Sequence, residues 1–185
     1  MPAVAIDPKV RLLPSAEEAF SWYVPLVQTF EQAVPMLVCG GDFGTASMPL
    51  DEWDRVPDAV VAGITVARLH GFNPTWALVS SEAWERYIDA SEENWEQVAD
   101  RIQHGDLEKA AALGDERVHD IVSIWGMTHR HAGYIAKAGF TRAKGYVSWG
   151  ELEVQDIEHP PPGVVFEGEM FAALKHALRQ PLAPT

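Results

Sequence analysis

The histidines are the residues of this sequence best suited to chemistry. His129 and His131 are two positions apart, so on a β-strand their imidazoles would share one face and could bind one metal ion. A further ligand would come from a neighbouring strand, with His119 and Glu151 as candidates. No His-Glu-x-x-His helix and no paired cysteines accompany them. We therefore expect loop residues rather than a metal site, with His129 and His131 kept as candidate catalytic groups.

Cys39 is the only cysteine and precedes a glycine-rich segment, Gly40 to Gly44. Backbone amides in such a segment can bind an anion or lower the pKa of a thiol, which would make Cys39 a nucleophile. The segment matches neither the dinucleotide fingerprint nor the phosphate-binding lysine motif, and its Asp42 would repel phosphate. We expect a buried structural cysteine, with catalysis as the alternative.

Other catalytic patterns find less support. The sequence has no Gly-x-Ser-x-Gly motif of the kind that carries a nucleophilic serine. Glu151 and Glu153 could do acid-base work, but alternating acids on a strand usually line its solvated face. Whether the chain is an enzyme therefore stays open, and we expect no cofactor.

Acidic residues form the other group of candidates, because 27 acids against 14 bases give a net charge of -13. An exposed aromatic among acids could anchor a basic protein partner, although such a tryptophan can also fold back over the core. The expected binding residues come from two acidic stretches: Asp51, Glu52, Trp53, Asp54, Glu92, Glu93 and Glu96.

Three functions stay open from these observations. The first is a small acidic interaction or regulatory protein that binds a protein partner. The second is a small enzyme or ligand-binding protein, with a pocket between sheet and helices that uses His129, His131 or Cys39. The third is an acidic inhibitor that mimics nucleic acid. Direct nucleic-acid binding is not expected, because the average surface repels phosphate.

Localisation is inferred from the missing apolar segments. No run approaches the roughly 18 apolar residues that a membrane span requires, so we expect no membrane contact. The first residues carry charges and prolines in place of the apolar stretch of a signal peptide. We therefore expect a cytoplasmic protein.

Local signals in the first half of the chain predict helices and short strands. Ser15 and Glu18 form a capping box that begins a helix, which Pro25 should kink or divide. Residues 36–39 suit a buried strand, and the stretch from there to Pro49 should be irregular. Pro57 fits the first turn of a second helix that stops at Gly71.

The second half of the chain changes from helical to strand patterns. Residues 76–79 suit a strand, followed by short helices around Trp84, over 92–104 and over 107–113. β-Branched and aromatic residues from Arg117 onward predict a central strand. Residues 134–141 and 146–154 then form a meander, and a last helix covers 170–179.

This order of elements predicts an α+β fold, in which several helices pack on one face of an antiparallel sheet. A doubly wound parallel sheet fits less well, because the late strands are too close in sequence for crossover helices. We expect a single domain over residues 1–185, with an extended N-terminal segment (1–14) and a short C-terminal tail (181–185).

Overall fold

The computed structural model describes residues 12–30, 33–41, 44–50, 55–86, 118–143, 145–160 and 169–179. Its helices are α1 (Ala16–Thr29), α2 (Val56–Leu69) and α5 (Glu169–Arg179). Its strands are β1 (Met36–Gly41), β2 (Gly44–Pro49), β3 (Trp76–Arg86), β4 (Val118–Thr128), β5 (Gly133–Ala143), β6 (Tyr146–Trp149) and β7 (Glu153–Asp156). The helices expected over 92–104 and 107–113 lie outside the described residues.

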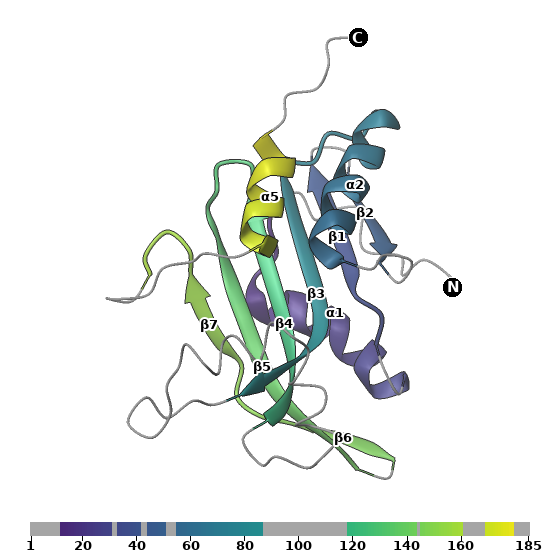
Figure 1. Ribbon diagram of the computed structural model, residues 1–185, viewed down its shortest axis with the longest axis vertical. Helices are drawn as coiled ribbons and strands as arrows, with labels where there is room; N and C mark the ends of the chain where they lie inside the picture. Colours follow the sequence, from purple (N-terminus) through teal and green to yellow (C-terminus); the bar gives the residue numbers. More distant parts are fainter. Residues whose placement is uncertain are drawn as a thin grey trace.

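The seven strands form one sheet with the order β2-β1-β3-β4-β5-β6, and every pairing is antiparallel (Figure 1). β7 also pairs with β5, along residues 134–137, while β6 pairs with residues 140–143. The two short strands therefore follow one another along the same edge of β5. The α+β class and the C-terminal meander are confirmed.

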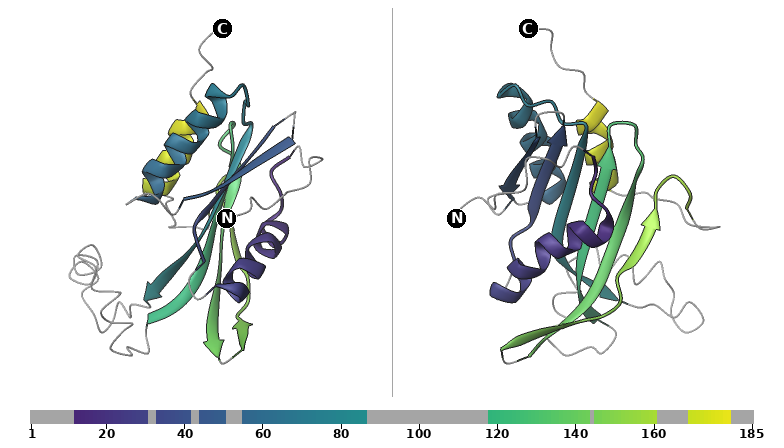
Figure 2. Two further views of the ribbon diagram at one scale, coloured as in Figure 1. Left: turned by 90° about the vertical axis from the view of Figure 1, so that its right-hand side faces the viewer. Right: turned by 180° about the vertical axis from the view of Figure 1, so that it is seen from behind.

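Helices cover both faces of this sheet, as Figure 2 shows. α1 packs on one face against an apolar cluster that includes Trp76, Leu78 and Ile124. α2 and α5 lie side by side on the other face, over a cluster that includes Leu37, Val79 and Met127. The expectation of helices on one face was therefore wrong. Central strands such as β1 are buried at consecutive positions, so each of their two faces needs a cover.

The helix boundaries follow the local signals. The Ser15 hydroxyl accepts a hydrogen bond from the Glu18 amide at 3.2 Å and caps α1, as the capping box predicts. α1 continues as one helix through Pro25. α2 has Pro57 in its first turn, and Gly71 follows its end with a φ of 80°, in the left-handed region that glycine adopts without strain.

Two strands differ from the sequence expectation. Residues 44–49 form β2, where an irregular stretch was expected, because they pair with β1 along their whole length. β3 runs on to Arg86, through the position of Trp84 where a short helix was expected. All eleven residues of β3 pair with β4, and this tertiary pairing outweighs the local capping signal.

Two arginines join the helices to their neighbours. The Arg142 guanidinium forms an ion pair with Glu82 and also donates to the carbonyls of Val27 and Phe30 at the end of α1. Arg68 of α2 donates to the carbonyls of Ala177 and Leu178 in the last turn of α5. These bonds satisfy carbonyls that a helix end leaves without internal partners.

Candidate functional site

A polar region interrupts the sheet face on which α2 and α5 pack. Near the helices this face carries apolar side chains, including Val79, Trp125 and Met127. Further along the same strands, residues of the same parity are polar or small, such as Ser81 and Ser123. In the middle of a sheet face this change of character marks a surface suited to polar contacts.

The strand register shows how the region is built. Ser81 lies beside Ser123, Ser123 beside Lys137, and Lys137 beside Glu153, so one row of polar residues crosses four strands. Glu85 of β3 lies beside His119 of β4, each four residues along its strand from Ser81 and Ser123. The two serine hydroxyls are 3.1 Å apart.

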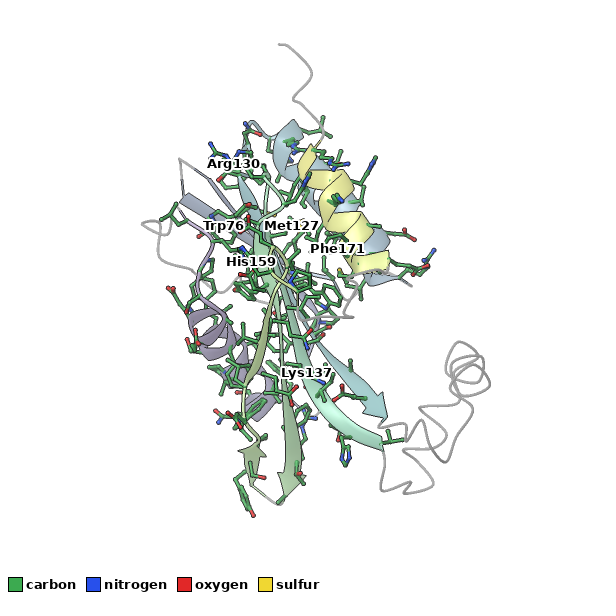
Figure 3. The ribbon with its side chains drawn as sticks, turned by 90° about the vertical axis from the view of Figure 1, so that its left-hand side faces the viewer. Trp76, Met127, Arg130, Lys137, His159 and Phe171 are labelled. Atoms are coloured by element: carbon green, nitrogen blue, oxygen red, sulfur yellow. The ribbon has the colours of Figure 1, made fainter. Side chains whose placement is uncertain are left out.

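A cavity of about 230 Å³ opens over this part of the sheet. We call it the polar hollow, and its lining residues are Glu85, His119, Ile121, Lys137, Gly139 and Glu153. Gly139 lines the bottom of the hollow and leaves space there because it has no side chain. The nearest atom to a Cβ built at this position is the Asp120 carbonyl oxygen at 3.9 Å. Figure 3 shows Lys137 on the strands beyond the end of α5.

Lys137 is the electrostatic centre of the hollow. Its ammonium forms an ion pair with Glu85 and a second with Glu153, whose nearest carboxylate oxygen is 3.5 Å away. Partial burial opposes the charged form, but the hydrogen bond and charge of Glu85, aided by Glu153, outweigh it and raise the pKa of Lys137. Lys137 is therefore a stable cation held by two carboxylates, which suits binding better than proton transfer.

His129 and His131 lie away from the hollow, in the turn between β4 and β5. Their place in a hairpin turn agrees with the expectation of loop residues. The His129 Nδ1 atom is 3.0 Å from the Thr75 carbonyl oxygen, and the Nε2 atom of His131 accepts a hydrogen bond from Arg179 at 2.9 Å. Each imidazole therefore already has a partner within the protein.

The metal-ligand candidates do not converge. His119 lies near the start of β4 and His129 directly after its end, about 33 Å apart at the usual rise of a strand. Glu151 is exposed in the link between β6 and β7. Within the described ranges, no three His, Cys, Asp or Glu residues are placed to hold a metal ion.

Cys39 lies in β1 with no exposed surface. Burial raises the pKa of its thiol to about 12, while the charge of Arg68 lowers it by less. At neutral pH this environment leaves very little thiolate, so it favours the structural interpretation of Cys39 over the catalytic one.

The residues predicted to bind a basic partner cannot be placed. Asp51, Glu52, Trp53, Asp54, Glu92, Glu93 and Glu96 all lie outside the described residues. Their role stays a prediction.

Sequence reasoning missed the polar hollow as a site. The sequence patterns indicate His119 as a metal-ligand candidate and Glu153 as a candidate for acid-base work or a solvated acid, but they do not indicate Glu85 or Lys137. A signal was nevertheless present, because Ser81, Ser123 and Lys137 occupy the strand parity of the buried Val79 and of the partly buried apolar residues Trp125 and Ile135. A polar residue at a core-facing strand position indicates a buried polar site, but only the strand register shows which residues meet.

No protein-family model, curated protein or solved structure matches this chain. Among the helices described, none is both long enough and apolar enough to span a membrane. The function therefore has to be argued from the chemistry of the site.

Proposed function

We propose that this chain is an acidic binding protein that recognises a basic protein partner, and that the polar hollow receives a lysine side chain of that partner. The observation that carries the proposal is the group of Glu85, Lys137 and Glu153 in one cavity. Two carboxylates around one ammonium leave one negative charge in the hollow.

The surroundings favour a cationic ligand further. The chain carries a net charge of -13, so its long-range field attracts cations and repels anions. The Glu153 side chain is 55% exposed and keeps an accessible carboxylate beside its bond to Lys137. A ligand ammonium would meet this carboxylate, with the hydroxyls of Ser81 and Ser123 in the same row as further acceptors.

Binding is favoured over catalysis by the state of the described reactive groups. Lys137 stays protonated, since the pKa of its ammonium is raised, and burial suppresses ionisation of Cys39. Neither group is prepared to act as a nucleophile or base near neutral pH. The enzyme and nucleic-acid mimic alternatives stay predictions.

The proposal is tested by calorimetric titration of the protein with a short lysine peptide at low salt. Glu153→Gln should weaken binding by roughly twofold to fivefold, the range for one exposed ion pair. Gly139→Val should abolish the specific component, because its side chain fills the hollow and a Cβ there has no close neighbour.

Glu151→Gln is the matched control. It removes the same charge two residues away, from an exposed side chain that does not line the hollow. Binding should stay close to that of the unaltered protein. Equal losses of affinity in Glu153→Gln and Glu151→Gln would show that the peptide is attracted by overall charge and does not enter the hollow. Failure of the lysine peptide to bind at low salt would also refute the proposal.

A further inference from the structure

The acidic residues of this chain are unevenly distributed. Three stretches contain neither aspartate nor glutamate: residues 59–81, 121–150 and 170–185. In the fold, parts of these stretches meet at one end of the molecule. The last turn of α2 contacts the last turn of α5 through Arg68, and Arg179 of α5 contacts His131 in the turn between β4 and β5.

Cations without a carboxylate partner gather at this end. Elsewhere, Arg55, Lys137 and Arg142 each form ion pairs with glutamate. Among the residues that the structure describes, no carboxylate pairs with Arg130, Lys175 or Arg179. We call these three residues, with His129 and His131, the cationic end. Figure 3 shows Arg130 far from Lys137 along the length of the molecule.

The cations of this end also act on His131. Partial desolvation lowers the pKa of His131, and the charges of Arg179, Lys175 and His129 lower it further. Because His131 accepts a hydrogen bond from Arg179 through Nε2, its imidazole is neutral at that atom. The guanidinium of Arg179 is thus bonded to a neutral partner, and no carboxylate within the described ranges pairs with it.

Helix stability explains only part of this arrangement. Lys175 and Arg179 lie in the last turns of α5, where cations complement the negative end of the helix. Arg130 belongs to the hairpin turn and has no such role. Its side chain is exposed and lies outside α5, so helix stability does not account for this charge.

We propose that the cationic end binds a short acidic segment of a partner protein. Arginine and lysine together suit carboxylates, which arginine can bind with two parallel hydrogen bonds. Leu69, 80% exposed and next in sequence to Arg68, offers an apolar contact that fits a peptide rather than a bare anion.

The extent of the cationic end argues against nucleic acid as the ligand. Charges are screened beyond about 8–10 Å at physiological salt, so a short peptide would interact mainly with the local cations. A nucleic-acid strand would extend past them and meet the field of a chain whose net charge is -13. The proposal does not depend on the function assigned to the polar hollow, which has the opposite charge preference.

The test is a titration of the full chain with a fluorescent hexaglutamate peptide at low salt. The variant R130Q/K175Q/R179Q should bind about tenfold more weakly, the combined effect of three exposed ion pairs. The double variant R130Q/K175Q leaves the bond between Arg179 and His131 intact and should show an intermediate loss. Thermal unfolding curves establish that each variant is folded.

Two comparisons distinguish binding at the cationic end from an effect of net charge. One is a matched pair of single variants, and the other is a variant in which the charges of the cationic end are reversed. Arg130→Gln should weaken binding, whereas Arg55→Gln, the same change before the first turn of α2, should not. The variant R130E/K175E/R179E should lose hexaglutamate binding and gain binding of hexalysine. Hexalysine binding of the unaltered protein through the polar hollow should persist in R130Q, so failure of one proposal is distinguishable from failure of the other.

Several results would overturn the inference. Equal effects of Arg55→Gln and Arg130→Gln on hexaglutamate binding would show that binding depends on net charge and not on the cationic end. Tighter binding of a short single-stranded oligonucleotide or of anionic lipid vesicles than of hexaglutamate would assign the cationic end to another class of ligand. A doubled mass in sedimentation at low salt, lost in R130Q/K175Q/R179Q, would assign it to a second copy of this chain.

Discussion

Two glycines of β5 have opposite surroundings. A Cβ at Gly133 would lie well inside contact distance of the Gly126 carbonyl oxygen, a backbone atom that cannot move aside without disturbing the β4–β5 pairing. A Cβ at Gly139 would have only one neighbour, at 3.9 Å. Close packing of strands therefore requires glycine at the first position, whereas glycine at the second position leaves open space.

These surroundings predict opposite stabilities for two alanine variants. Gly133→Ala should lower the free energy of unfolding by about 1–3 kcal/mol, the usual cost of overpacking. Gly139→Ala should change it by less than about 1 kcal/mol, with a gain if the unfolded chain loses entropy. Urea denaturation of both variants measures the difference. A Gly139→Ala variant as unstable as Gly133→Ala would contradict the open floor of the polar hollow.

At the residue scale, sequence reasoning succeeded where the signal is local. The Ser15 cap and the place of Pro57 in the first turn depend on neighbours a few positions away, and the structure confirms both. The ion pairs of Lys137 join residues 52 and 16 positions apart in sequence. Such pairs depend on strand register, which no local pattern determines.

At the scale of elements, His131 links α5 to the hairpin between β4 and β5. Its φ of 66° lies in the left-handed region, and its ring accepts the bond from Arg179. The pKa of His131 is lowered from its ordinary value of 6.5, first by desolvation and then by the surrounding cations. Protonation would remove the acceptor and place a cation beside Arg179.

The sign of the pH effect follows from this shift. Because the native state holds the proton of His131 less tightly than the unfolded chain, the unfolded chain binds more protons as pH falls below about 6.5. The free energy of unfolding should therefore fall from about pH 7.5 to about pH 5.5. The free energy of unfolding of the His131→Asn variant should fall less over this pH range. Asparagine tolerates the left-handed region and offers an acceptor that does not titrate.

Urea denaturation at both pH values measures this effect as the difference between variant and unaltered protein. His159→Asn is the control, because the exposed His159 ring contacts the Asp156 carboxylate at 3.2 Å and not Arg179. The His159→Asn variant should lose at least as much stability at low pH as the unaltered protein does. An identical pH dependence of His131→Asn and the unaltered protein would contradict the role of His131.

Pairing between distant elements accounts for the errors in secondary structure. β3 carries the Ser80 and Ser81 signals that favour a helix start, yet Ser81 contacts Ser123 on the neighbouring strand. β2 begins with the small or polar residues 44–47 and has no clear strand period, and its pairing with β1 makes it a strand. β4 and β5 were predicted correctly, because their β-branched and aromatic residues agree with their tertiary environment. The strand expected over residues 146–154 is divided into β6 and β7, which pair with different parts of β5.

At the scale of the whole molecule, charge is the dominant feature. The net charge of -13 destabilises the compact state through self-repulsion, while the three bases of the cationic end have no carboxylate partner among the residues that the structure describes. The net charge and the segments without acids can be read from the sequence. Only the structure shows that these segments meet at one end of the molecule.

Salt should therefore stabilise this protein. The Debye length shortens from about 30 Å at 0.01 M ionic strength to about 8 Å at 0.15 M, so screening acts first on the long-range repulsion among the acids. Relief of about 1 kcal/mol would raise the Tm by roughly 2–4 °C for a chain of this size. Exposed ion pairs such as Arg55 with Glu169 weaken under the same conditions, but such pairs add little to stability.

Thermal unfolding in sodium chloride and in potassium chloride measures this effect, and equal responses would identify screening rather than specific ion binding. Arg130→Gln makes the net charge one unit more negative and should enlarge the salt response, while Glu151→Gln makes it one unit less negative and should reduce it. Both side chains are exposed, and neither has an ion pair within the described part of the chain, so each variant changes charge with little change in packing. A Tm that falls with salt would mean that attractive pairs outweigh the repulsion expected from the net charge.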